Sequence, residues 1–170
     1  DDDIYFLVAT QYVSTTTTSS LDAALTATTD ANILLTNFTN WGNAGNFGVT
    51  LDDGQLWTAR NICDATVGCG VVGLAWVGTV CNSNRYHLLE DYTGSNPGGT
   101  NWQLRVMTSH EMGHNFSCNH DAAGAGTIMA PSVNNTSTWS AQSITELNTY
   151  IGTVSCLAIC GANFSSTSYT

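Results

Sequence analysis

The stretch from His110 to Asp121 constrains this chain more than any other part of its sequence. It reads His-Glu-Met-Gly-His-Asn-Phe-Ser-Cys-Asn-His-Asp. On a helix of about 3.6 residues per turn, His110 and His114 lie on the same face, so both imidazoles can reach one cation. Glu111 lies beside that face, where its carboxylate is free to act as a base.

A third histidine, His120, lies too far beyond His114 to join it on a continuous helix. We therefore expect the helix to end near Phe116 and the chain to turn back. Three protein ligands leave one position of a tetrahedral zinc site open for water, as in catalytic rather than structural zinc sites. A pair of histidines at this spacing can also arise by chance on a solvated helix face. The third histidine, Asp121 and the downstream Met129 favour the zinc interpretation.

The composition limits the remaining possibilities. The chain has 170 residues without an evident linker or repeat, so we expect a single domain over residues 1–170. Three basic residues stand against 13 acidic ones, and the net charge of -10 disfavours a nucleic-acid or anionic-membrane partner. The fourth histidine, His87, is flanked by apolar residues and is interpreted as a strand side chain without a metal role.

Six cysteines without paired C-x-x-C spacing favour disulfides, which places the protein in an oxidising compartment outside the cell or in a periplasm. No apolar run approaches the roughly 20 residues of a membrane span. The chain opens on Asp1 and lacks a signal peptide, so we interpret it as a processed or trimmed form of a secreted protein.

Periodicity and turn signals predict mixed secondary structure. We expect strands at 4–13, 47–51, 71–80 and 85–89, with an irregular stretch or short helix at 55–62. Helices are expected at 30–41, from near Asn101 to Phe116, and beneath the site with an apolar stripe of Ile144, Leu147, Ile151 and Val154. Either Ser143, through a capping box with Glu146, or Ser140 could cap this last helix.

The run from Val71 to Val80 is the most strand-like and contains two glycines. Glycine within a strand often marks the close approach of another backbone, so this run could receive an extended peptide as an additional strand. A core strand with packing glycines is an equally good interpretation.

Together these residues carry a family likeness. The pattern His110-Glu111-x-x-His114, His120-Asp121 and Ile128-Met129 resembles the metzincin zinc peptidases of the reprolysin or adamalysin group. Further blocks that resemble this group are Leu35-x-x-Phe38-x-x-Trp41, a block around Asp53, Leu56 and Thr58, Val72 to Cys81, and Glu90-Asp91. The resemblance implies an α/β zincin-type fold, with a mixed twisted sheet, an active-site helix, a Met-turn and a C-terminal helix.

The same resemblance implies roles for individual residues. His110, His114 and His120 would bind zinc, Glu111 would be the general base, and Met129 would form the turn under the metal. Asp121 would anchor that turn by hydrogen bonds. Val72, Gly73 and Leu74 would pair with a peptide or protein substrate. The wall of the pocket for the residue after the cut would be Ala130, Pro131, Ser132 and Val133. No Tyr follows Met129, which argues against the astacin and serralysin branches.

The sequence departs from the family pattern in several places. Ser117 occupies a turn position that is usually Gly, at a cost of about 1 kcal/mol, and it completes the glycan acceptor pattern Asn115-Phe116-Ser117. The matching blocks start at what resembles the family's second strand, so we expect its first strand and first long helix to be absent. Cys118 replaces an apolar residue in the turn of the third ligand.

Six cysteines allow 15 connectivities. Family matching suggests Cys81 with Cys156, proximity suggests Cys63 with Cys69, and Cys118 with Cys160 follows by elimination. The resemblance also allows a structural calcium near Asp53 and the C-terminal segment.

The resemblance implies a monomeric zinc endopeptidase that hydrolyses internal peptide bonds of extracellular proteins. Two alternatives remain open. Ser117 and the absent N-terminal elements favour a zinc-stabilised binding module that has lost catalysis, and the intact Glu111 argues against it. An exopeptidase would need groups that block one end of the cleft.

Overall fold

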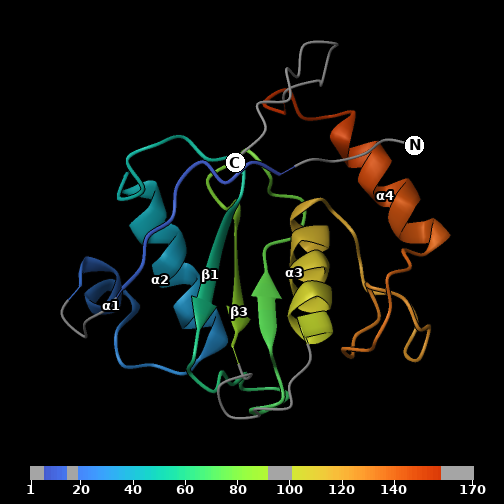
Figure 1. The fold of residues 1–170 in the computed structure, drawn as a ribbon, viewed down its shortest axis with the longest axis horizontal. Helices are drawn as coiled ribbons and strands as arrows, with labels where there is room; N and C mark the ends of the chain where they lie inside the picture. The colour runs from blue at the N-terminus through green and yellow to red at the C-terminus, as the bar shows by residue number, and fades with distance from the viewer. Residues whose placement is uncertain (1–5, 15–18, 92–100, 158–170) are drawn as a thin grey trace, which may run out of the picture.

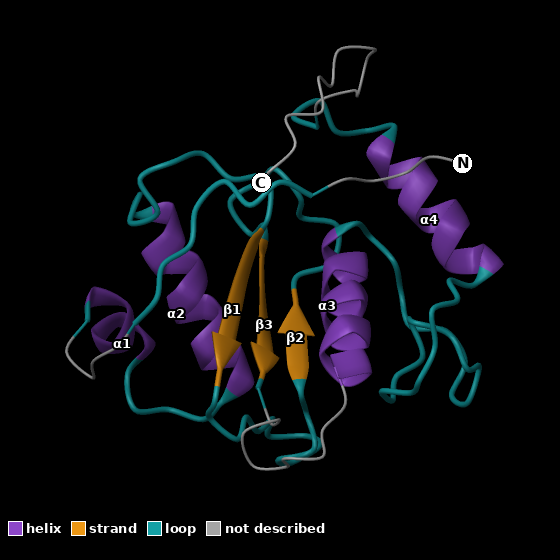
Figure 2. Cartoon of the chain, in the orientation of Figure 1, coloured by secondary structure: helices purple, strands orange, loops and turns teal. Residues whose placement is uncertain are grey.

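The computed structural model describes residues 6–14, 19–91 and 101–157, and within them it has a mixed α/β architecture (Figure 1). A small sheet stands between helices, as Figure 2 shows. In chain order the elements are α1 (Ser20–Leu25), α2 (Ala31–Asn43), β1 (Gly54–Thr58), β2 (Gly73–Ala75), β3 (Tyr86–Glu90), α3 (Asn101–Asn115) and α4 (Ala141–Ile151).

The sheet has the order β1-β3-β2, with β1 parallel and β2 antiparallel to the central strand. The expectation of a mixed sheet is thus confirmed. The first four residues of β3 are buried, which is typical of a strand covered on both faces. Tyr86 and Leu88 belong to the core cluster that contains α2, whereas His87 bonds to Asn115 of α3. The sheet therefore separates the core from the helix that carries the histidine motif.

Helix α2 forms where the sequence predicted a helix. Asp30 is its N-cap, and the Asp30 side chain accepts a hydrogen bond from the backbone N–H of Ile33. The helix buries one apolar face against the sheet, with Leu34, Leu35, Phe38 and Trp41 in the core. Phe38 makes an edge contact with Tyr86 of β3, with ring centroids 5.3 Å apart.

Three predicted strands differ from the structure. Residues 6–13 of the predicted first strand have no regular structure, and Leu7 and Val8 are 78% and 86% exposed. Residues 1–5 lie outside the described part of the chain. The segment 47–51 forms bends and turns, because Gly48 has a φ of 70°. Only Gly73–Ala75 of the run 71–80 is a strand, since the chain turns at Gly78, where φ is 66°.

One strand forms where the sequence did not predict it. The segment 55–62 was expected to be irregular or helical, yet Gly54–Thr58 forms β1. Its burial alternates along the strand, with Leu56 inside and Trp57 39% exposed. The first position of this strand, Gly54, has no room for a side chain, because a Cβ there would lie 2.5 Å from the Tyr86 ring. The short helix α1 was also missed.

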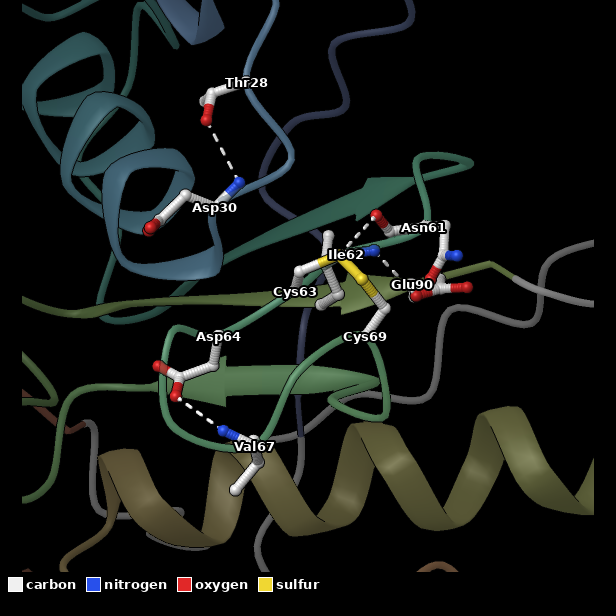
Figure 3. The surroundings of a disulfide bond; sticks show 9 residues. All are labelled: Thr28, Asp30, Asn61, Ile62, Cys63, Asp64, Val67, Cys69 and Glu90. Carbon is white, nitrogen blue, oxygen red and sulfur yellow. Dashed lines mark hydrogen bonds between the residues drawn. A yellow bond between two sulfur atoms is a disulfide. The ribbon is translucent and has the colours of Figure 1, made fainter.

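Two expected disulfides are present, Cys63–Cys69 and Cys81–Cys156. Figure 3 shows the first, which closes a short loop between β1 and β2. The Asp64 carboxylate accepts the backbone N–H groups of Thr66 and Val67 within this loop. Next to the loop, the backbone N–H of Ile62 donates to the Glu90 carboxylate (Figure 3).

The third suggested bond, Cys118 with Cys160, stays a prediction, because one of its partners is not among the described residues. Cys118 is a buried free thiol that donates to the Ser143 carbonyl, and Cys160 lies outside the described residues. None of the described helices is long and apolar enough to cross a lipid bilayer.

Candidate metal centre

Helix α3 ends at Asn115, close to the position that the histidine spacing requires. The next turn is tight. The backbone N–H of Ser117 donates to the His114 carbonyl, and that of Cys118 donates to the Gly113 carbonyl. Ser117 adopts a left-handed conformation with a φ of 74°. The turn therefore has the left-handed geometry that glycine usually supplies, although a side chain is present.

This turn brings the three histidines together. The Nε2 atoms of His110 and His120 lie 3.1 Å apart, and Nε2 of His114 lies 3.2 Å from each of them. Nδ1 of His110 faces the Ile128 carbonyl at 2.7 Å, and Nδ1 of His114 faces the Cys118 carbonyl at 2.7 Å. A carbonyl oxygen can only accept, so each of these Nδ1 atoms carries the proton. The Nε2 lone pairs of His110 and His114 therefore point inward.

These donors fit a zinc ion. Lone pairs converging at this distance repel one another unless a cation lies between them. Nitrogen ligands on a tetrahedral zinc, at about 2.0 to 2.1 Å from the metal, lie roughly 3.3 Å apart. The backbone carbonyls behind His110 and His114 fix the tautomer and orient the rings, as carbonyls commonly do behind metal-binding imidazoles. The residues that sequence analysis proposed as ligands are thus the ones that the fold assembles.

Protonation favours the same interpretation. Burial lowers the pKa of His110 below its usual value, and burial, followed by the positive charge of the neighbouring His110, lowers the pKa of His114 to about 4. Both imidazoles are consequently neutral at physiological pH, which is the form that binds a metal.

Glu111 lies beside the three histidines and is only 7% exposed. Burial raises the pKa of its carboxyl group to about 8, so the group can take up and release a proton near neutral pH. Its carboxylate packs against Gly73 of β2, where an added Cβ would lie 2.3 Å from Oε1. A glycine in the run 71–80 was predicted to mark the close approach of another backbone. At Gly73 the group that approaches is instead the Glu111 side chain.

The predicted Met-turn lies under the histidines. Met129 is fully buried in a cluster with Cys118 and Ile128. Gly113 of α3 leaves room for it, since a Cβ there would lie 2.6 Å from Met129 Sδ. Asp121 anchors the turn as expected: its backbone N–H donates to the Met129 carbonyl, and its carboxylate accepts the hydroxyls of Ser140 and Thr127.

The residues proposed to contact substrate form two groups, one at strand β2 and one directly after Met129. Gly73 and Leu74 lie in β2, which pairs with β3 along one edge and has no other strand partner among the described residues. Val72 lies just before β2 and accepts the backbone N–H of Glu90. Of the predicted pocket wall, Ala130 is buried, while Pro131, Ser132 and Val133 are exposed. Ala130 therefore supports the turn, and the other three can face a ligand.

Sequence analysis treated Asn115 only as part of a glycan pattern. In the structure it is fully buried. Its Nδ2 donates to the Trp76 carbonyl, the Thr79 hydroxyl and the Tyr86 carbonyl, and its Oδ1 lies 2.7 Å from Nδ1 of His87. Asn115 therefore ties the end of α3 to the sheet. The sequence signal that could have indicated this role is the position of Asn115, directly after the proposed ligand His114.

Asp53 also has an internal role. Its carboxylate lies 3.4 Å from Nδ1 of His87 and accepts the backbone N–H of Gly54. The carboxylate near the C-terminal segment is instead that of Asp52, which approaches the Cys81–Cys156 disulfide.

Known proteins share this arrangement of sequence. A model of the reprolysin-like metallopeptidase family M12B matches residues 4–169. Human "A disintegrin and metalloproteinase with thrombospondin motifs 1" is 32% identical over 102 residues, which are 56% of this chain and 10% of the relative. Mouse "A disintegrin and metalloproteinase with thrombospondin motifs 16" is 30% identical over 141 residues, which are 76% of this chain and 11% of the relative. The chain thus spans only about a tenth of these relatives, and by the family match it belongs to the reprolysin-like metallopeptidase family M12B.

Proposed function

We propose that this chain is a zincin-type catalytic domain that hydrolyses internal peptide bonds of extracellular proteins. The convergence of three Nε2 atoms beside one buried carboxyl group is the observation that carries the proposal. Family membership supports it independently. His110, His114 and His120 would hold one zinc ion. When bound, zinc would lower the pKa of a coordinated water towards about 7 and polarise the substrate carbonyl.

Glu111 would act as the general base and then as the general acid. As a carboxylate it takes the proton of the attacking water, and as a carboxylic acid it delivers that proton to the leaving amine. Its burial excludes bulk water from this exchange. Asp121 and Met129 would keep the floor of the site rigid, so that the three imidazoles stay in place during the reaction.

The free edge of β2 would position the substrate. An extended peptide can add to such an edge as another strand, with backbone hydrogen bonds that do not depend on the side chains of the substrate. Because Gly73 contacts Glu111, a peptide on this edge would place a backbone amide next to the base. The exposed Pro131, Ser132 and Val133 would line the pocket that selects the residue after the cut.

The two disulfides and the secreted character implied by the sequence support an extracellular location. The substrate would be a protein or peptide, and the domain would act as a monomer. A structural calcium ion near Asp53 and the C-terminal segment remains a prediction that a metal analysis can test.

Incubation with a denatured protein, with and without a chelator, tests the proposal. We expect internal fragments that disappear with the chelator and return with added zinc. Terminal trimming would instead indicate an exopeptidase, and intact substrate at full zinc loading would indicate a binding module. Glu111→Ala should retain zinc and lose cleavage. Cleavage at the wild-type rate by this variant would remove Glu111 from its role.

A further inference from the structure

His120 differs from the other two histidines in the element of structure on which it lies. His110 and His114 lie on α3, whereas His120 is exposed and lies in a loop without regular structure. A side chain on such a loop loses conformational freedom when it binds a metal, which weakens binding unless the loop is already ordered. The contacts of the residues next to His120 therefore bear on metal affinity.

Asn119 and Asp121, the two neighbours of His120, both form hydrogen bonds with helix α4 or with its N-cap. On one side, Oε2 of Glu146 accepts the backbone N–H of Asn119 at 2.8 Å, and Oε1 accepts the Asn119 side-chain amide at 3.0 Å. On the other side, the hydroxyl of Ser140, the N-cap of α4, donates to the Asp121 carboxylate at 2.7 Å. The residues on either side of His120 are thus hydrogen-bonded to the same helix or to its N-cap.

The contact to Glu146 is not a helix-capping interaction. A capping box would direct Glu146 back to Ser143, but the helix begins after Ser140, whose side chain accepts the backbone N–H of Ser143. Glu146 is one turn further along and instead reaches across to Asn119, 27 residues away in sequence. Two hydrogen bonds from one carboxylate to one residue fix both the position and the rotation of that residue.

We infer that Glu146 is a positioning residue, which orders the Asn119–His120 segment for zinc binding and thereby raises zinc affinity. The inference rests on the proposed zinc site but not on peptide hydrolysis. Partners behind metal ligands typically contribute about 10- to 100-fold to metal affinity. Because the hydrogen bonds of Glu146 are partly exposed to solvent, we expect the lower end of this range.

Zinc affinity and zinc release, measured by competition with a chromophoric chelator, test the inference. We expect Glu146→Ala to bind zinc about 10-fold more weakly and to release it faster. Glu146→Gln keeps an acceptor for Asn119, so its loss should be smaller. Asn148→Ala, an exposed change on the same helix, is the matched control and should bind as the wild type does.

The melting temperature of each zinc-free variant separates positioning from general stability. Positioning predicts that Glu146→Ala affects zinc release more than zinc-free melting. Asn119→Ala should also weaken binding, and adding it to Glu146→Ala should cost less than the sum of the two changes. Wild-type zinc affinity in a folded Glu146→Ala would overturn the inference, as would equal losses in Glu146→Ala and Asn148→Ala. A wild-type protein that binds no zinc would overturn the proposed function as well.

Discussion

Gly73 lies so close to Glu111 that a Cβ at position 73 would be 2.3 Å from the Oε1 atom and 2.7 Å from the Cδ atom of that carboxyl group. Cβ atoms essentially never show non-bonded contacts this short, so a side chain at position 73 requires a shift, most cheaply of the flexible Glu111 side chain. The glycine in β2 therefore leaves room for the carboxyl group of Glu111, the proposed general base.

Gly73→Ala is expected to lower kcat at least about 10-fold, because a displaced base loses part of the 10²- to 10⁴-fold that proton transfer contributes. Zinc affinity should change little, since the three imidazoles do not move. Steady-state kinetics and zinc titration give the two readouts. Gly70→Ala is the control, because nothing lies within 4 Å of a Cβ at that position. An unchanged kcat in Gly73→Ala would show that Glu111 has room elsewhere.

Ser117→Gly should stabilise the protein. Ser117 has a φ of 74°, a conformation that costs a non-glycine residue roughly 1 to 2 kcal/mol. Glycine also makes the unfolded chain more flexible, which offsets about 0.4 to 1 kcal/mol. We therefore expect a net gain of up to about 1 kcal/mol, measured as a shift in the urea midpoint. Ser117→Ala keeps the strain and should show no such gain; a destabilised Ser117→Gly would mean that the Ser117 hydroxyl outweighs the strain.

The zinc-free protein should lose stability as the pH rises from about 6.5 to 8, above the range in which the lowered pKa values of His110 and His114 act in the opposite direction. Burial raises the pKa of Glu111 from 4.5 to about 8, so between these values the folded state keeps a proton that the unfolded state has released. Stability then falls with increasing pH. Urea unfolding in chelator at several pH values measures this slope. In Glu111→Gln the slope should be smaller, and equal slopes in the two proteins would exclude this contribution of Glu111.

Asn115 should carry no glycan in folded protein from a glycosylating host. Its side chain is fully buried and donates three hydrogen bonds, so a sugar there would exclude the native packing. Asn135, in the pattern Asn135-Thr136-Ser137, is exposed and provides an internal control. Peptide mass spectrometry of the folded fraction compares the two sites. A glycan found on Asn115 would contradict the buried position.

The cluster of three histidines that forms the candidate metal centre could be predicted from the sequence, because most of the information for it is local. The spacing of His110 and His114 follows from helix geometry, and the change of direction before His120 follows from the requirement for a third ligand. Ser117 adopts the conformation that this turn demands even though it is not glycine. The anchoring role of Asp121, in contrast, was proposed from the resemblance to the metzincin peptidases.

The remaining features depend on distant contacts. The run 71–80 is apolar throughout, and apolarity alone could not show that the strand stops at Ala75. The same limitation applies to Ile144, which was predicted to face the site but is 49% exposed, while Ser143 is the buried residue of that helix. The role of Glu146 depends on how α4 docks, and a sequence pattern carries no signal for that docking.

The Cys81–Cys156 bond joins residues 75 positions apart, and the ring that it closes contains α3, all three histidines and Met129. By the chain-entropy estimate such a ring adds about 4 kcal/mol. It also means that a cut in the exposed stretch 122–126 would not release either piece. A nicked molecule would migrate as two bands only after reduction, so the fragment with the three histidines and the fragment with Met129 would stay tethered in one particle even after the backbone between His120 and Met129 had been severed.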